Sequence, residues 1–224
     1  MKSIRLCLVA GVAALLGTAA GAQEVARLYP PQPPAGTSYV RVVNPSAQSA
    51  RVVIGADGAP QALAASAEVT TPFSVVAVGQ PVVISVDGKR LREQKVAPGT
   101  VVTFVLARAA NGTWNVTPIA ETAGSGDGLK AELRFYNLAT GCSGNLAIAD
   151  GPNVFSSIGA GEMRMRAINP VQAKLVGACG AAQSGTLALP PLKAGDHYSV
   201  FLVGDAAHPQ LLGRIDQVAP YAAH

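Results

Sequence analysis

The chain alternates between short apolar runs, often rich in β-branched residues, and residues that favour turns. In its first half the runs are Tyr39–Val43, Arg51–Ile54, Phe73–Val78, Val82–Val86, Thr100–Leu106 and Thr113–Ile119. Runs of this length bounded by Gly, Pro, Asn and Asp are typical of β-strands. Two dipeptides between such runs, Asp87-Gly88 and Asn111-Gly112, predict hairpin turns because these residues tolerate positive φ.

The second half repeats this pattern of short runs separated by turns. Its runs are Leu129–Tyr136, Asn145–Ala149, Val154–Ile158, Met163–Ile168, Ala173–Val176, Thr186–Leu189, Tyr198–Val203 and Leu211–Ile215. No segment shows a sustained apolar period of 3.6 residues, which an amphipathic helix would require. The sequence therefore predicts an all-β protein.

The two halves also share marker residues. Arg41-Val42-Val43-Asn44 returns 93 residues later as Arg134-Phe135-Tyr136-Asn137. A period of this size is too long for a solenoid repeat, and it fits one small β domain. We therefore expect two tandem antiparallel β-sandwich domains, residues 39–120 and 129–219. The Gly-rich stretch 121–128 between them predicts a short flexible linker.

The N-terminus predicts a signal peptide and an extended arm. Residues 1–22 have a basic start, an apolar run and small residues at the end, which together are typical of a cleaved secretory signal. Residues 23–38 contain Pro30, Pro31, Pro33 and Pro34 and predict a proline-rich arm. Loss of Lys2 and Arg5 with the signal lowers the formal net charge from +4 to +2. No basic run remains that favours nucleic acid binding.

Two cysteines remain after the signal is removed, Cys142 and Cys179. An even number of cysteines in a secreted chain indicates a disulfide. A redox or metal-binding pair is the weaker interpretation, because there is no Cys-x-x-Cys motif and the histidines show no ligand spacing. We expect a structural disulfide in the second domain.

The sequence predicts no catalytic residue, metal ligand or cofactor. Asp205 and His208 have the Asp-x-x-His spacing of SGNH-type esterases and acetyltransferases, but the Gly-Asp-Ser block that supplies the nucleophile in those enzymes is missing. Most acidic residues stand beside Gly at turn positions, which explains them without a paired-carboxylate active site.

Five residues are candidate contacts for a partner or a polymer. Arg41 and Arg134 of the repeated motif either pair with the carboxylates of a partner or acidic polymer, or are simply solvated. Trp114 is either a core residue or an aromatic platform for a sugar. Tyr136 is a further aromatic candidate, as is Tyr29 in the arm.

Several of these segments together resemble one known family. They are Leu28-Tyr29-Pro30, the stretch Pro34–Asn44, Leu133-Arg134-Phe135-Tyr136-Asn137 and the Cys142/Cys179 pair. Taken together, these segments make the chain resemble the alginate O-acetylation accessory protein family AlgF over its whole mature length. Each motif is weak alone and moderately specific in combination.

The resemblance implies a periplasmic protein that takes part in the O-acetylation of an exopolysaccharide, most simply alginate. The implied partners are periplasmic SGNH-type acetyltransferases and a membrane O-acyltransferase, with the acidic polysaccharide itself as a further candidate. It implies a non-catalytic adaptor rather than the transferase. Two alternatives remain open: an extracellular β-sandwich adhesin or surface protein, and the equivalent accessory protein of cellulose acetylation.

Overall fold

The computed structural model describes residues 33–121 and 128–220. The regular secondary structure of these residues consists of β-strands, and they contain no helix. The prediction of an all-β protein is confirmed. Within these residues the structure contains no helix long and apolar enough to cross a membrane. The signal peptide, Tyr29, most of the proline-rich arm and most of the linker lie outside the described residues.

The first domain is a sandwich of two sheets. The inner sheet has the order β4 (Ser74–Ala77), β1 (Thr37–Val43), β7 (Val101–Arg108) and β8 (Trp114–Glu121). The outer sheet has the order β3 (Gln61–Leu63), β2 (Ala50–Ile54), β5 (Val82–Val86) and β6 (Lys89–Gln94). Apolar side chains from both sheets, among them Val40, Ile84 and Phe104, form the first core.

The second domain repeats this arrangement. Its inner sheet has the order β12 (Glu162–Ile168), β9 (Ala131–Asn137), β16 (His197–Gly204) and β17 (Pro209–Ile215). Its outer sheet has the order β11 (Asn153–Ile158), β10 (Gly144–Ile148), β13 (Lys174–Cys179) and β14 (Ala182–Gln183), and β15 (Leu187–Ala188) also pairs with β13. Leu133, Phe135 and Leu146 lie in the second core.

The two domains have equivalent topologies. In each inner sheet one parallel pair stands among antiparallel neighbours: β1 with β7, and β9 with β16. Arg41 lies opposite Thr103 in the first pair, and Arg134 lies opposite Ser199 in the second. The repeated sequence motif therefore marks equivalent strands at the centre of each domain.

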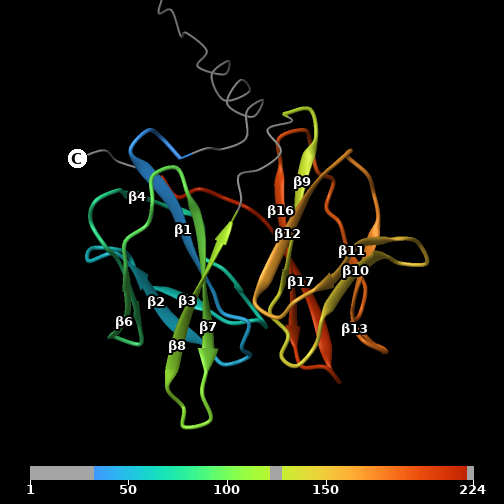
Figure 1. The fold of residues 1–224 in the computed structure, drawn as a ribbon, viewed down its shortest axis with the longest axis horizontal. Helices are drawn as coiled ribbons and strands as arrows, with labels where there is room; N and C mark the ends of the chain where they lie inside the picture. Colours follow the sequence, from blue (N-terminus) through green and yellow to red (C-terminus); the bar gives the residue numbers. More distant parts are fainter. Residues whose placement is uncertain (1–32, 122–127, 221–224) are drawn as a thin grey trace, which may run out of the picture.

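The inner sheets pack against each other, so the molecule has four layers (Figure 1). The outer sheets with β2 and β13 lie on opposite sides, and the sheets with β1 and β9 lie between them. A third apolar cluster joins the two domains, with Val43 and Ile119 from the first domain and Tyr136, Met163 and Phe201 from the second.

This arrangement explains why β1 and β9 are buried along their whole length. Successive side chains of a strand point to opposite faces of the sheet. Val40 and Val42 belong to the core of the first domain, whereas Val43 belongs to the cluster between the domains. A strand covered on both faces needs no polar side, so any polar residue in it must find its partners inside the protein.

The boundaries between segments differ in detail from our expectations. Thr37 and Ser38, which we assigned to the arm, are the first residues of β1. Glu121, which we assigned to the linker, is the last residue of β8 and is buried. Asp87 and Gly88 both have positive φ, as the predicted hairpin turn requires.

Candidate functional site

Arg41 lies at the centre of a polar cluster between the two inner sheets. Its side chain is only 1% exposed. Within its own domain, Nε donates to Thr103 Oγ1 at 2.9 Å. Across the interface, Nη1 donates to Asp216 Oδ1 at 2.8 Å, and Nη2 donates to Tyr136 Oη at 2.6 Å and Ser199 Oγ at 2.9 Å. One buried guanidinium thus binds four side chains, three of them in the other domain.

Arg134 makes the reciprocal connection from the second domain. Its Nη1 donates to Glu121 Oε2 of the first domain at 3.2 Å, and the same nitrogen lies 3.4 Å from Asp216 Oδ2 of its own domain. Its Nε donates to Glu132 Oε1 at 2.8 Å. Each arginine therefore pairs with a carboxylate at the end of the last inner-sheet strand of the opposite domain.

The hydroxyl groups of the cluster also occupy equivalent places in the two domains. Ser199 donates to Asp216 Oδ1 at 2.7 Å, and Thr103 donates to Glu121 Oε1. Each hydroxyl binds a carboxylate of its own domain, while each arginine reaches the carboxylate of the other. We call Arg41, Thr103, Glu121, Arg134, Ser199 and Asp216 the reciprocal network.

Aromatic rings enclose the guanidinium of Arg41. Its central carbon lies 4.4 Å from the ring centre of Phe73, 5.1 Å from that of Tyr136 and 5.5 Å from that of Phe201. A cation over the face of an aromatic ring is attracted to it, and the attraction is larger where water is excluded. Burial raises the pKa of Tyr136, so its hydroxyl stays protonated.

Glu132 and His197 extend the network at one side. Nδ1 of His197 lies 3.1 Å from Glu132 Oε1 and 3.0 Å from Nη2 of Arg134. Burial alone would raise the pKa of Glu132, but the hydrogen bond with His197 and the charge of Arg134 outweigh it and lower the pKa to about 2. Glu132 is therefore ionised throughout the ordinary pH range.

The asparagines of the repeated motif have an equivalent structural role. Asn44 Nδ2 donates to the carbonyl oxygens of Gln48 and Leu63, both at 2.8 Å. Asn137 Nδ2 donates to those of Cys142 at 3.0 Å and Ile158 at 2.9 Å. Each amide fixes the segment that follows the central strand. The motif thus combines an arginine for the interface with an asparagine for the loop.

Both domains line several cavities along their interface, and two of them are large. The larger, about 650 Å³, lies between the segment Glu68–Phe73 of the first domain and β17 of the second. Arg214 at its edge donates from Nε to Glu68 Oε1 across the domains at 3.0 Å. The other, about 560 Å³, lies between the edge strands β8 and β12. We call the larger cavity the interdomain groove.

The structure corrects the expected role of three candidate contacts. Arg41, Arg134 and Tyr136 are buried between the domains rather than exposed to a partner. The two arginines do bind carboxylates, but these all belong to the same chain, and each arginine has one of them in the opposite domain. These side chains are buried because β1 and β9 are covered on both faces. The sequence shows which side chains alternate between the two faces of a strand, but it does not show what covers each face.

Trp114 is also largely buried and belongs to the first core. Its indole Nε1 donates to Asp87 Oδ2 at 2.9 Å, and the guanidinium of Arg108 lies 4.8 Å from the ring centre. The ring is therefore packed as a core residue and is not an open platform. Tyr29 lies outside the described residues.

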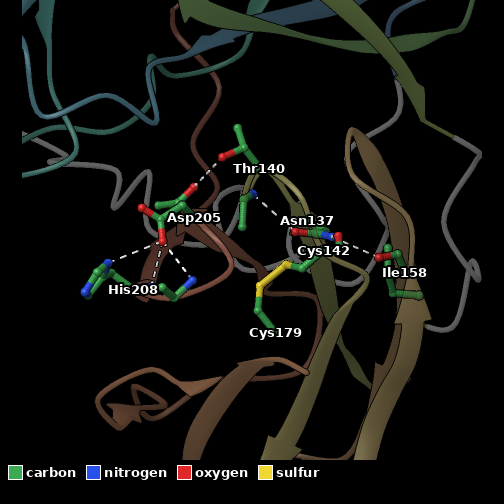
Figure 2. Close-up of a disulfide and its surroundings, with 10 residues drawn as sticks. Asn137, Thr140, Cys142, Ile158, Cys179, Asp205 and His208 are labelled. Carbon is green, nitrogen blue, oxygen red and sulfur yellow. Dashed lines mark hydrogen bonds and ion pairs between the residues drawn. A yellow bond between two sulfur atoms is a disulfide. The ribbon is translucent and has the colours of Figure 1, made fainter. Parts of the chain in front are cut away.

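The predicted disulfide between Cys142 and Cys179 is confirmed (Figure 2). It joins the loop after β9 to the end of β13.

Nearby, Asp205 Oδ1 accepts hydrogen bonds from the backbone N–H groups of Ala207 and His208, both at 2.8 Å. Asp205 and His208 thus form the exposed turn between β16 and β17. Within residues 33–121 and 128–220, no cluster of His, Cys, Asp or Glu could hold a metal ion.

Four residues of the reciprocal network were missed from the sequence: Thr103, Glu121, Ser199 and Asp216. The four form two pairs that repeat with nearly the 93-residue period of the arginines, because Ser199 follows Thr103 by 96 positions and Asp216 follows Glu121 by 95. Extending the repeat beyond the Arg-x-x-Asn motif would have found them.

A family model described as "Alginate O-acetyl transferase AlgF" matches residues 10–198, well over half of the chain. Among solved structures, the chain is similar to the carbohydrate-binding module CBMbc (family CBM26) from Eubacterium rectale Amy13K in complex with maltoheptaose. The two share 10% identity and a TM-score of 0.26, covering 82% of this chain and 98% of that one. No curated protein sequence matched.

Proposed function

The chain belongs to the AlgF family and has a role in alginate O-acetylation, and from this premise we propose that it is a periplasmic, non-catalytic adaptor. In this proposal it bridges acetyltransferase components to one another or to the polymer. The partners implied by the resemblance are periplasmic SGNH-type acetyltransferases and a membrane O-acyltransferase.

The observation that carries the proposal is the reciprocal network. Arg41 binds Asp216 of the second domain, and Arg134 binds Glu121 of the first. Four buried charges fixed in this way, together with the apolar cluster around Tyr136 and Phe201, hold the domains face to face. A bridging protein needs two outer surfaces at a fixed separation, and this packing supplies them.

The hydroxyl groups at the centre of the molecule support an adaptor rather than a transferase. Acyl transfer through a covalent intermediate needs an accessible nucleophile beside a general base. Ser199 and Thr103 are fully buried, and each already donates its proton to a carboxylate that binds an arginine. Their hydrogen bonds serve the contact between the domains.

The disulfide supports a location outside the cytoplasm. Disulfides persist in oxidising compartments such as the bacterial periplasm, and they are rare in the cytosol. Cys142 and Cys179 are bonded in the structure. The proposed location agrees with the signal peptide that the sequence predicts.

The proposal is tested by reconstitution with the mature full-length chain. The tagged chain is mixed with a periplasmic acetyltransferase of the alginate system and with the detergent-solubilised membrane O-acyltransferase, and complexes are separated by gel filtration. We expect the two enzymes to elute together only when the chain is present. Elution of both enzymes apart from the chain would contradict bridging. Surface display of the chain without any change in polymer acetylation would support an adhesin instead.

A further inference from the structure

The segment that follows β17 leaves the second domain and pairs with the first. The N–H of Phe73 donates to the carbonyl of Gln217 at 2.7 Å, and the N–H of Ala219 donates to the carbonyl of Phe73 at 2.8 Å. These bonds form a parallel bridge between Phe73 and Val218. We call Gln217–Ala219 the C-terminal strap. It follows directly on Asp216, the carboxylate that binds Arg41.

The residue that the strap holds is part of the cover over both arginines. Phe73 is 3% exposed, and its ring centre lies 4.4 Å from the guanidinium carbon of Arg41 and 5.9 Å from that of Arg134. The strap therefore fixes the backbone of an aromatic residue that shields two buried charges from solvent. Movement of the strap would free the backbone of Phe73 and expose the two guanidinium groups to solvent.

The strap also lies between two cavities. Gln217 lines the interdomain groove of about 650 Å³, and Val218 lines a smaller cavity of about 100 Å³. Both cavities share Phe73 and Asp216 in their walls. The smaller cavity is also lined by Arg134 and His197, so it is the space next to the charged cluster.

Two backbone hydrogen bonds hold the strap on Phe73. Val218 of the strap is 40% exposed, and Ile215 at the end of β17 is 47% exposed, so both apolar side chains bury only part of their surface. Segments with little buried apolar surface and few hydrogen bonds open at low free energy, independently of the core. The reciprocal network, in contrast, is buried.

We propose that the C-terminal strap detaches reversibly from Phe73 and thereby opens one side of the interdomain interface. When the strap leaves Phe73, the smaller cavity joins the groove and the side of the cluster with Arg134 and His197 becomes accessible to solvent, while the outer sheets stay folded. This proposal follows from the packing of Gln217–Ala219 on Phe73, and it stands whether or not the chain bridges acetyltransferases.

The test uses a substitution that removes one bond of the strap in the full chain. Ala219→Pro deletes the N–H that donates to Phe73, because proline has no backbone donor. Ala219→Ser keeps the N–H and serves as the matched control. Diethylpyrocarbonate labels accessible imidazoles, and mass spectrometry reports labelling at His197. His208, whose side chain is 84% exposed, is the internal reference in the same chain.

We expect Ala219→Pro to raise the rate of His197 labelling relative to His208 by up to about tenfold, the factor that corresponds to the loss of one backbone hydrogen bond. Ala219→Ser leaves the ratio unchanged. An unchanged ratio in Ala219→Pro overturns the proposal.

Hydrogen exchange in the same samples separates local release from unfolding. In Ala219→Pro, exchange accelerates in the peptide Thr70–Phe73, while β5 and β13 in the outer sheets keep their wild-type rates. Equal acceleration in β5 and β13 would mean that the substitution destabilises the whole chain. This result would also overturn the proposal that the strap is released locally. A second variant ending after Asp216 lacks the strap entirely and must give the same two readouts.

Discussion

Arg41 and Asp216 stand 175 positions apart in the chain, yet Nη1 of the arginine lies 2.8 Å from Oδ1 of the aspartate. The bond crosses the interface between the domains and is almost completely buried. Its counterpart joins Arg134 to Glu121 in the opposite direction. Arginines that the repeated sequence suggested for a partner thus bind the equivalent carboxylates within the same molecule.

Removal of Arg41 is expected to be strongly destabilising. Arg41→Ala leaves the buried carboxylate of Asp216 without its cationic partner across the interface, and breaking one side of a buried ion pair costs about 3–5 kcal/mol. Urea unfolding of the mature chain measures the loss. The matched control is Arg90→Ala, because Arg90 pairs with Glu93 on the surface with its side chain 66% exposed.

Exposed ion pairs contribute at most about 1 kcal/mol, so Arg90→Ala should unfold close to wild type. A similar small loss in both variants would show that the buried network does not hold the domains together. The comparison depends on the difference between the two arginines, which makes it insensitive to the total stability of the chain.

Asn137 is expected to matter for the loop that carries the disulfide. Asn137→Ala removes the donor to the carbonyls of Cys142 and Ile158 and leaves both without this partner. Each buried group that loses its hydrogen bond costs about 1–3 kcal/mol. We expect about 2–4 kcal/mol in thermal or urea unfolding. The exposed Asn153 provides the control, and Asn153→Ala should change stability by less than about 0.5 kcal/mol.

The disulfide is expected to stabilise the second domain. Cys142 and Cys179 are 37 positions apart, and closing a loop of this length restricts the unfolded chain by about 4 kcal/mol in the chain-entropy description. The double variant Cys142→Ser/Cys179→Ser should lose most of this in urea unfolding. Adding a reductant should destabilise the wild type and leave the double variant unchanged. Equal sensitivity of both proteins to reductant would contradict a structural disulfide.

The charge on Glu132 predicts a defined dependence on pH. Its pKa in the folded chain is about 2, below the ordinary value of 4.5. A carboxyl group with a lowered pKa stabilises the folded state above its ordinary pKa, and the contribution disappears as the pH falls through the folded value. The stabilisation by Glu132 is therefore complete near pH 6 and is lost between about pH 4.5 and pH 2.

The measurement compares the free energy of unfolding of the wild type and Glu132→Gln across this range. The wild type should be more stable by about 3 kcal/mol at pH 6, and most of the difference should be lost by pH 2. Other carboxyl groups titrate in both proteins and cancel in the difference. A difference that stays constant from pH 6 to pH 2 would contradict the role assigned to the charge.

Much of the fold follows from local sequence signals. Alternating β-branched runs and turn dipeptides predict the strands, and Asp87-Gly88 forms its hairpin turn because only a few residues accept positive φ. The cysteine pair was predictable because the expected removal of the signal peptide would leave two cysteines, which allow a single pairing. These signals depend on neighbouring residues, which a single sequence displays.

The interface between the domains could not be predicted in the same way. Arg41 stands between two valines of a strand, and the alternation says that it faces away from the core but not what covers that face. Glu121 stands next to a Gly-rich stretch and therefore looked like part of the linker. The strap on Phe73 is equally non-local, because the pairing joins residues from different domains.

The central claim, that the chain connects acetyltransferase components and does not transfer the acetyl group itself, is tested most directly by an acetyl-transfer assay. Purified mature chain is incubated with a donor ester and the polymer, alone and together with a periplasmic acetyltransferase, and the acetyl content of the polymer is measured. We predict no transfer by the chain alone and increased transfer when it accompanies the enzyme. Transfer by the chain alone, abolished by His208→Ala or by substitution of a single serine, would contradict the account.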